Sequence, residues 1–239
     1  MFVILAIDAL EYELVYRYSC EHLMQQHHGK TDISEFSEPR TMVLWSSFMT
    51  GKNQESYILS FGDKEMWNVR FDITDTFFSK FQNPCVIDLP GYSYDLIQHG
   101  KERELLKAFF ETSEREKKEE IKKEYNSLAF SHHRIIKERF EEAMNGDYDL
   151  VIGYFSVADV VGHLNFSNDM MMRMIYREFD EMASAIPGPK LILSDHGMEA
   201  LGVFGDHSTY GFWSSGSFDL GTPRITDFHH LIEKLKEGN

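Results

Sequence analysis

Short apolar runs recur along the chain, and they limit its fold more than any other feature of the sequence. The runs are rich in large apolar side chains and are shorter than most buried helices. Continuous apolar strands of this kind are typical of parallel sheets that are covered on both faces. The expected strands are residues 2–7, 85–89, 148–155 and 190–194.

Helical patterns separate these runs. Methionines crowd one of the helical segments, and we interpret them as flexible core filling. Strands that alternate with helices in this way predict an α/β fold with a mostly parallel central sheet. The expected helices are residues 10–27, 41–50, 167–185 and 226–236.

The composition sets the size of the fold and excludes one class of partner. The chain has 239 residues, with 24 Lys and Arg against 39 Asp and Glu, so its net charge is −15. Such an acidic balance argues against a nucleic-acid-binding surface, which needs a basic face. With 42% hydrophobic residues the chain can build a sizeable core, and we expect one domain over residues 1–239.

The most charged part of the chain, about residues 92–146, is expected to form a helical insert. Its acidic and basic residues stand three or four places apart, as for example Glu116 and Glu120 do from Lys123. That spacing is typical of a solvated helix with surface ion pairs. A helical cap over a functional site is a second interpretation, and the two are compatible.

The sequence favours a cytoplasmic location. It contains no run of roughly 18 apolar residues, so we expect no membrane span. The apolar start of the chain ends at Asp8 and lacks the basic segment of a secretory signal. Cys20 and Cys85 are too few for a disulfide framework or a cysteine-rich zinc site.

Acidic and histidine side chains follow three of the expected strands. Each alone has an ordinary interpretation as a turn former, a helix cap or a structural histidine. The carboxyl ends of parallel strands meet at one edge of a sheet, so we expect these side chains to converge. Three carboxylates and three imidazoles suit zinc, manganese or iron, and they exceed one tetrahedral centre. The candidate metal ligands are Asp8, Asp159, His163, Asp195, His196 and His207.

Thr41 is the candidate nucleophile. Pro39 disfavours helix before it, and the apolar stretch from Met42 favours helix after it. Thr41 would then lie at a helix N-terminus, where free N–H groups attract anions. A hydroxyl placed there beside a metal is easier to deprotonate and can attack phosphorus. A simple role as a helix cap is the alternative interpretation.

These motifs together resemble the alkaline phosphatase superfamily, and in particular its type I phosphodiesterase and nucleotide pyrophosphatase branch. Along the chain they stand in the family's order and span almost its whole length. Thr41 precedes its Thr-Gly pair by the nine residues that the family shows. The motifs are Ile7-Asp8, Arg40-Thr41 with Thr50-Gly51, Asp159-x-x-Gly162-His163, Asp195-His196-Gly197-Met198 and His207.

The resemblance implies a fold, a reaction and a cofactor. The fold would be a three-layer α/β/α sandwich with a mostly parallel sheet, forming a single catalytic domain. The reaction would be hydrolysis of a phosphodiester or phosphomonoester through a phosphothreonine at Thr41. Two divalent metal ions would assist, with zinc as the family's commonest choice and manganese or iron as alternatives. By the same resemblance, Asp8, Asp195 and His196 would hold one ion, and the second would bind Asp159, His163 and His207.

The sequence departs from this branch where the family binds phosphate. The branch places an asparagine after the Thr-Gly pair, and Gly62 stands at that position here. Arg40, next to the nucleophile, is a candidate replacement because a guanidinium binds phosphate oxygens in pairs. An ordinary surface arginine is the alternative interpretation of the same residue.

The predicted partner is therefore a small-molecule phosphate ester, with neither nucleic acid nor membrane. Three alternatives stay open within the same family resemblance: a phosphomutase, a phosphonate hydrolase, and a member that binds metal or a phosphorylated ligand without turnover. A scaffold whose charged segment recruits a partner is a further alternative from another class.

Overall fold

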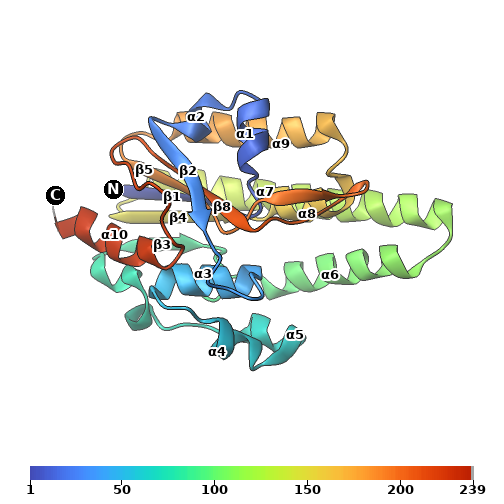
Figure 1. The fold of residues 1–239 in the computed structure, drawn as a ribbon, viewed down its shortest axis with the longest axis horizontal. Coiled ribbons are helices and arrows are strands. Elements are labelled where there is room, and N and C mark those ends of the chain that lie inside the picture. The colour runs from blue at the N-terminus through green and yellow to red at the C-terminus, as the bar shows by residue number, and fades with distance from the viewer. Residues whose placement is uncertain (238–239) are drawn as a thin grey trace.

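The computed structural model describes residues 1–237, and a six-stranded sheet forms their centre (Figure 1). The strand order is β2-β8-β5-β1-β4-β3. Strands β1, β3, β4 and β5 are parallel, whereas β8 runs antiparallel to both of its neighbours, β5 and β2. A short hairpin, β6–β7, lies outside this sheet. The strands are β1 Phe2–Ile7, β2 His27–Asp32, β3 Pro84–Ile87, β4 Leu150–Phe155, β5 Lys190–Ser194, β6 Met198–Leu201, β7 Phe204–His207 and β8 Tyr210–Ser215.

Helices cover both faces of the sheet. They are α1 Tyr12–Arg17, α2 Glu21–Met24, α3 Thr41–Thr50, α4 Glu55–Leu59, α5 Gly62–Glu65, α6 Leu96–Glu111, α7 Arg115–Met144, α8 Val157–Asn165, α9 Asp169–Ala185 and α10 Asp227–Glu237. Three short 3₁₀ segments complete the elements: η1 Met66–Asn68, η2 Ile73–Asp75 and η3 Phe77–Lys80.

Two hydrophobic cores sandwich the sheet, one on each face. Side chains alternate along β1, so Val3 and Leu5 point into one core while Ile4 and Ala6 point into the other. The first core is completed by α7, α8 and α9, and the second by α3 and α10. Burial on both faces explains why β1, β4 and β5 are apolar without interruption. The predicted three-layer α/β/α arrangement is confirmed.

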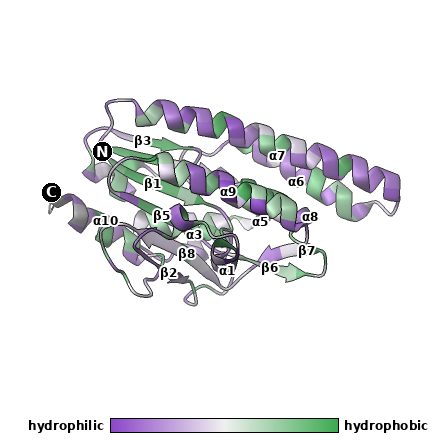
Figure 2. Cartoon of the chain, turned by 90° about the horizontal axis from the view of Figure 1, so that it is seen from above, coloured by the Kyte–Doolittle hydropathy of each residue, from purple (hydrophilic) through white to green (hydrophobic). Residues whose placement is uncertain are grey.

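The charged segment forms two long helices, α6 and α7, that run side by side (Figures 1 and 2). Only one stripe of α7 is buried, and hydrophilic residues dominate the rest of its surface (Figure 2). Within residues 1–237, no helix combines the length and the apolar character that crossing a membrane requires. The assignment of the whole chain to one catalytic domain stays a prediction.

The single helix expected at residues 10–27 is wrong. The segment breaks into α1, α2 and the start of the edge strand β2. Ser19 and Gln25 have φ angles of 55° and 48°, in the left-handed region that no right-handed helix contains. From His27 onward the chain instead pairs with β8. Tertiary pairing therefore overrides the local helical pattern.

A buried ion pair fastens α7 to the end of β3. His132 Nε2 lies 2.7 Å from Asp88 Oδ2, and both side chains are almost fully buried. The second Asp88 oxygen accepts a hydrogen bond from the N–H of Asp95, which caps α6. Burial alone would lower the pKa of His132, but the hydrogen bond and the charge of Asp88 outweigh it and raise this pKa above 6.5.

We expect His132→Gln to lower the free energy of unfolding by about 3 kcal/mol, because Asp88 would keep a buried charge without its partner. The raised pKa of His132 adds stability that is complete below its unfolded value and is lost as pH rises. The effect should therefore be larger at about pH 6 than at about pH 8.5 in urea unfolding. The double variant with Asp88→Asn should recover part of the loss; an additive double variant would contradict the pairing.

Candidate metal centre

The first group of candidate ligands lies at the carboxyl ends of β1 and β5. Asp8 follows β1, and Asp195 and His196 follow β5. All three side chains are buried, and one potential ligand atom from each lies within 4.8 Å of the others. His196 Nε2 is 3.3 Å from Asp8 Oδ1 and 3.5 Å from Asp195 Oδ2.

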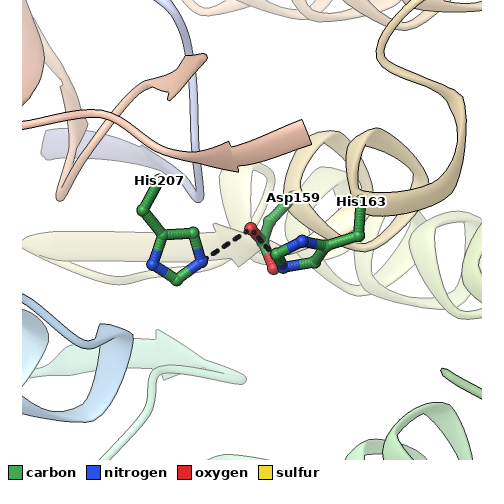
Figure 3. Close-up of side chains that lie close together, drawn as sticks. All are labelled: Asp159, His163 and His207. Atoms are coloured by element: carbon green, nitrogen blue, oxygen red, sulfur yellow. Dashed lines mark ion pairs between the residues drawn. The ribbon is translucent and has the colours of Figure 1, made fainter. Parts of the chain in front are cut away.

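The second group lies beside the end of β4. Asp159 and His163 are one turn apart on α8, and His207 ends β7 (Figure 3). Asp159 Oδ1 is 3.3 Å from His163 Nε2 and 3.5 Å from His207 Nε2. One carboxylate oxygen therefore faces both imidazoles.

The two groups touch each other. The rings of His196 and His207 stack with their centroids 3.9 Å apart, and the charge of Asp159 acts on Asp8. The structure thus brings all six predicted side chains into one cluster at the carboxyl edge of the sheet. Their role as metal ligands stays a prediction.

Several oxygen and nitrogen atoms of this cluster are buried without a hydrogen-bond partner among the described residues. They are Asp8 Oδ1, Asp159 Oδ1, both carboxylate oxygens of Asp195, and His196 Nε2. A buried polar atom without a partner costs free energy. All of these atoms can donate an electron pair to a cation, and an oxygen and imidazole set suits zinc, manganese or iron. The residues present therefore fit divalent metal binding.

Burial shifts the pKa values of the first group toward the neutral forms. It raises the pKa of Asp8 to about 7, with a further rise from the charge of Asp159. It also raises the pKa of Asp195 well above its ordinary value and lowers that of His196 to about 3. In the second group, burial alone would lower the pKa of His163. The charge and hydrogen bond of Asp159 outweigh burial and raise this pKa to about 9. A divalent cation would offset the cost of these crowded carboxylates.

Hydrogen bonds to the backbone orient two of the imidazoles. His196 Nδ1 donates to the carbonyl of Gly197 at 2.9 Å, and His163 Nδ1 donates to the carbonyl of Gly205 at 3.2 Å. In the neutral form of each ring, Nε2 then carries the lone pair, and it faces the cluster. Such a second contact fixes the orientation of a metal-binding histidine.

Two glycines permit the close packing around these ligands. A Cβ on Gly211 of β8 would lie 2.3 Å from the carbonyl oxygen of Ser194, at the end of β5. A Cβ on Gly162, in the Asp-x-x-Gly-His motif, would lie 2.3 Å from the sulfur of Met198. A side chain at either position would push apart the segments that carry Asp195 and His163.

Thr41 borders the same cavity as part of the cluster. This cavity, of about 740 Å³, is lined by Thr41 together with Asp8, Asp159, His163 and His207. Thr41 is the buried first residue of α3, so free N–H groups of the helix N-terminus lie beside it. A hydroxyl, an anion-binding helix end and the candidate metal ligands therefore meet at one cavity.

Arg40 does not line this cavity. Its guanidinium is paired with Glu38 at 2.6 Å and with Asp63 at 2.5 Å. Binding of substrate by Arg40 would require it to exchange these partners, and its predicted role stays untested. Lys64 and Arg103 do line the cavity. Neither was predicted, because nothing in the sequence distinguishes them from ordinary surface charges.

The side chains that form hydrogen bonds with Asp8 and with the backbone of Met198 were also not predicted. The Tyr154 hydroxyl donates to Asp8 Oδ2. Glu11 accepts hydrogen bonds from the N–H of Met198 at 3.0 Å and from the Tyr210 hydroxyl at 2.6 Å. Tyr154 belongs to an expected strand, and its place one residue before the strand's end could have indicated a side chain near the site.

Comparison with known proteins gives a distant likeness among solved structures. No protein-family model matches the chain, and no curated protein matches it. Among solved structures, murine ectonucleotide pyrophosphatase/phosphodiesterase 5 is similar over 82% of this chain and 57% of that protein. The identity is 13% and the TM-score is 0.41. The chain spans little more than half the length of that protein.

Proposed function

We propose that the protein is a metal-dependent hydrolase of phosphate esters, acting on a phosphodiester or a phosphomonoester. The observation that carries the proposal is the convergence of six ligand side chains, with unpartnered buried atoms, beside Thr41 at a helix N-terminus. Two ions at such a centre would supply positive charge that stabilises the transferring phosphoryl group and makes the Thr41 hydroxyl easier to ionise.

The ligands would divide between the two ions as the two groups do. Asp8, Asp195 and His196 would hold one ion, and the group of Asp159, His163 and His207 would hold the other. Zinc is the proposed metal, with manganese or iron as alternatives for a site with this many carboxylates. The shared His196–His207 stack would keep the two sites adjacent.

Thr41 would act as the nucleophile. Its Oγ would form a bond to phosphorus as the bond from phosphorus to the leaving oxygen breaks, and the leaving alcohol would take up a proton. The N–H groups at the start of α3 would hold the phosphoryl oxygens during this step. Water would then hydrolyse the phosphothreonine, release phosphate or a phosphomonoester, and restore the hydroxyl.

A hydrolysis assay tests the proposal. The protein is treated with a chelator, supplied with zinc or with manganese, and given p-nitrophenyl phosphate or bis(p-nitrophenyl) phosphate. We expect metal-dependent release of nitrophenol, and the preferred ester narrows the substrate class. No turnover of either ester by metal-loaded protein would contradict a general phosphoesterase and favour a mutase or a binding protein.

A further inference from the structure

The cavity beside the candidate metal centre extends along a wall that the proposed chemistry does not use. Its volume of about 740 Å³ is in the range that holds a ligand of drug size, well beyond a phosphate group. Residues of α6 and of the short helix α5 form part of the cavity lining, here called the α5–α6 wall. Arg103 and Lys107, one turn apart on α6, and Lys64 of α5 all line it.

Two of these cations form no ion pair among the described residues, although the charge of Arg103 acts on Asp63 of α5. Neither Lys64 nor Arg103 forms an ion pair there, whereas the neighbouring Arg40 is held by two carboxylates. Lys107 is paired with Glu111 at 3.6 Å, but both side chains are exposed and such pairs are weak. The chain as a whole has a net charge of −15, so a cluster of three cations on this wall is a local exception.

The acids of the same wall do not cancel these cations. Glu104 lines the wall but is exposed, so solvent screens its charge. Glu102 is buried and accepts a hydrogen bond from Gln98 at 2.7 Å. Burial raises the pKa of Glu102 to about 7, so this carboxyl carries less than a full negative charge at neutral pH. The wall is therefore suited to an anion.

Arg103 shares the cavity with a pair of aromatic rings. Burial and then the charge of Arg103 lower the pKa of His99 on α6 to about 4. The rings of His99 and Trp67 lie against each other with centroids 3.8 Å apart, and both line the cavity. An apolar stem of a ligand can rest on this ring pair while its charged end reaches Arg103.

We propose that the substrate carries a second anionic group, separate from the phosphoryl group that reacts, and that Arg103 with Lys64 binds it. This inference rests on the proposed function and names the substrate class: a phosphate ester with a further carboxylate or phosphate. The guanidinium fork of Arg103 suits either group.

Phosphonates of one chain length test the proposal by isothermal titration of the metal-loaded protein, without turnover. The probes are hexylphosphonate, 6-phosphonohexanoate and hexane-1,6-bisphosphonate, with 3-phosphonopropionate against propylphosphonate as a shorter pair. We expect a probe with a second acid to bind about tenfold or more tightly than its alkyl counterpart. Comparing the carboxylate with the bisphosphonate shows which second group is preferred.

Substitutions test whether Arg103 and Lys64 bind the second anionic group. Arg103→Ala and Lys64→Ala should remove most of that preference and leave the affinity for hexylphosphonate unchanged, since both side chains are exposed and dispensable for folding. The matched control is Lys101→Ala, because Lys101 is an exposed cation of α6 that does not line the cavity. It should keep the preference.

Other outcomes overturn the proposal. Equal binding of charged and alkyl probes at both lengths would exclude a second anion site, while metal-dependent binding of hexylphosphonate would still support the proposed function. Absence of all phosphonate binding would contradict both. If Lys101→Ala lost the preference for a second acid as completely as Arg103→Ala, the preference would reflect net charge alone, and the proposed contact would be wrong.

Discussion

Replacing Thr41 with alanine should lower kcat for a phosphate ester by at least about 10³-fold, because alanine has no hydroxyl that could form the covalent intermediate at the start of α3. The bound metal should stay, since Thr41 belongs to neither ligand group. The variant is checked by steady-state hydrolysis and by elemental analysis of the same preparation.

The matched control is Thr41→Ser, which keeps a hydroxyl at the start of α3 and should retain measurable turnover. A second control is Thr50→Ala at the other end of α3, where the hydroxyl donates to the carbonyl of Ser46 at 2.7 Å. Full activity in Thr41→Ala would contradict the assignment of Thr41 as the nucleophile. Equal loss in Thr41→Ala and Thr50→Ala would indicate a structural role instead.

Asp195→Asn should change the stability of the protein in opposite directions with and without metal. Asp195 is fully buried, and neither of its oxygens has a hydrogen-bond partner among the described residues. Without metal, an amide of the same shape avoids the cost of burying or protonating this carboxylate, so the substitution should raise the free energy of unfolding by about 1–3 kcal/mol. With metal, the loss of a ligand should shrink the stabilisation that binding supplies.

Urea unfolding in a chelator and in excess zinc measures both effects. Asp206→Asn is the control, because Asp206 is an exposed neighbour outside both ligand groups and should change little in either condition. Should Asp195→Asn destabilise the protein equally with and without metal, Asp195 would have a structural role and no part in binding an ion.

Strands with a continuous apolar run were predictable from the sequence, as at β1, β4 and β5. The strand β8 is also buried, but it was missed because Gly211 and two serines interrupt its apolar residues. The strand β2 was missed because it lies at the edge of the sheet, where it is only partly buried and polar. Its residues therefore carry no apolar signal, and their pairing with β8 is a contact between distant segments.

The candidate ligands were predictable for a related reason. The carboxyl ends of parallel strands meet at one edge, so Asp8 and Asp195 needed only the strand assignment. Asp159 and His163 needed only the four-residue spacing of a helix. The backbone groups and tyrosines that orient these side chains were not predictable. They are brought into place by tertiary packing, which a single sequence does not reveal.

Charged side chains on helices were the hardest to interpret. Arg40 and Arg103 have the same chemistry, yet Arg40 is paired with two carboxylates whereas Arg103 lines the cavity. Likewise His132 and Asp88, 44 residues apart, meet in a buried pair. Adjacency to the nucleophile in sequence does not determine where a long side chain points, because the positions of α5 and α6 decide it.

Metal analysis of the reconstituted chain tests the central claim most directly. The protein is stripped with a chelator, supplied with zinc or manganese, freed of unbound ions and analysed for metal per chain. We expect about two ions per chain, with one lost in Asp195→Asn and the other lost in Asp159→Asn. Retention of no metal by the unaltered protein, or a content that neither substitution changes, would contradict a two-metal centre.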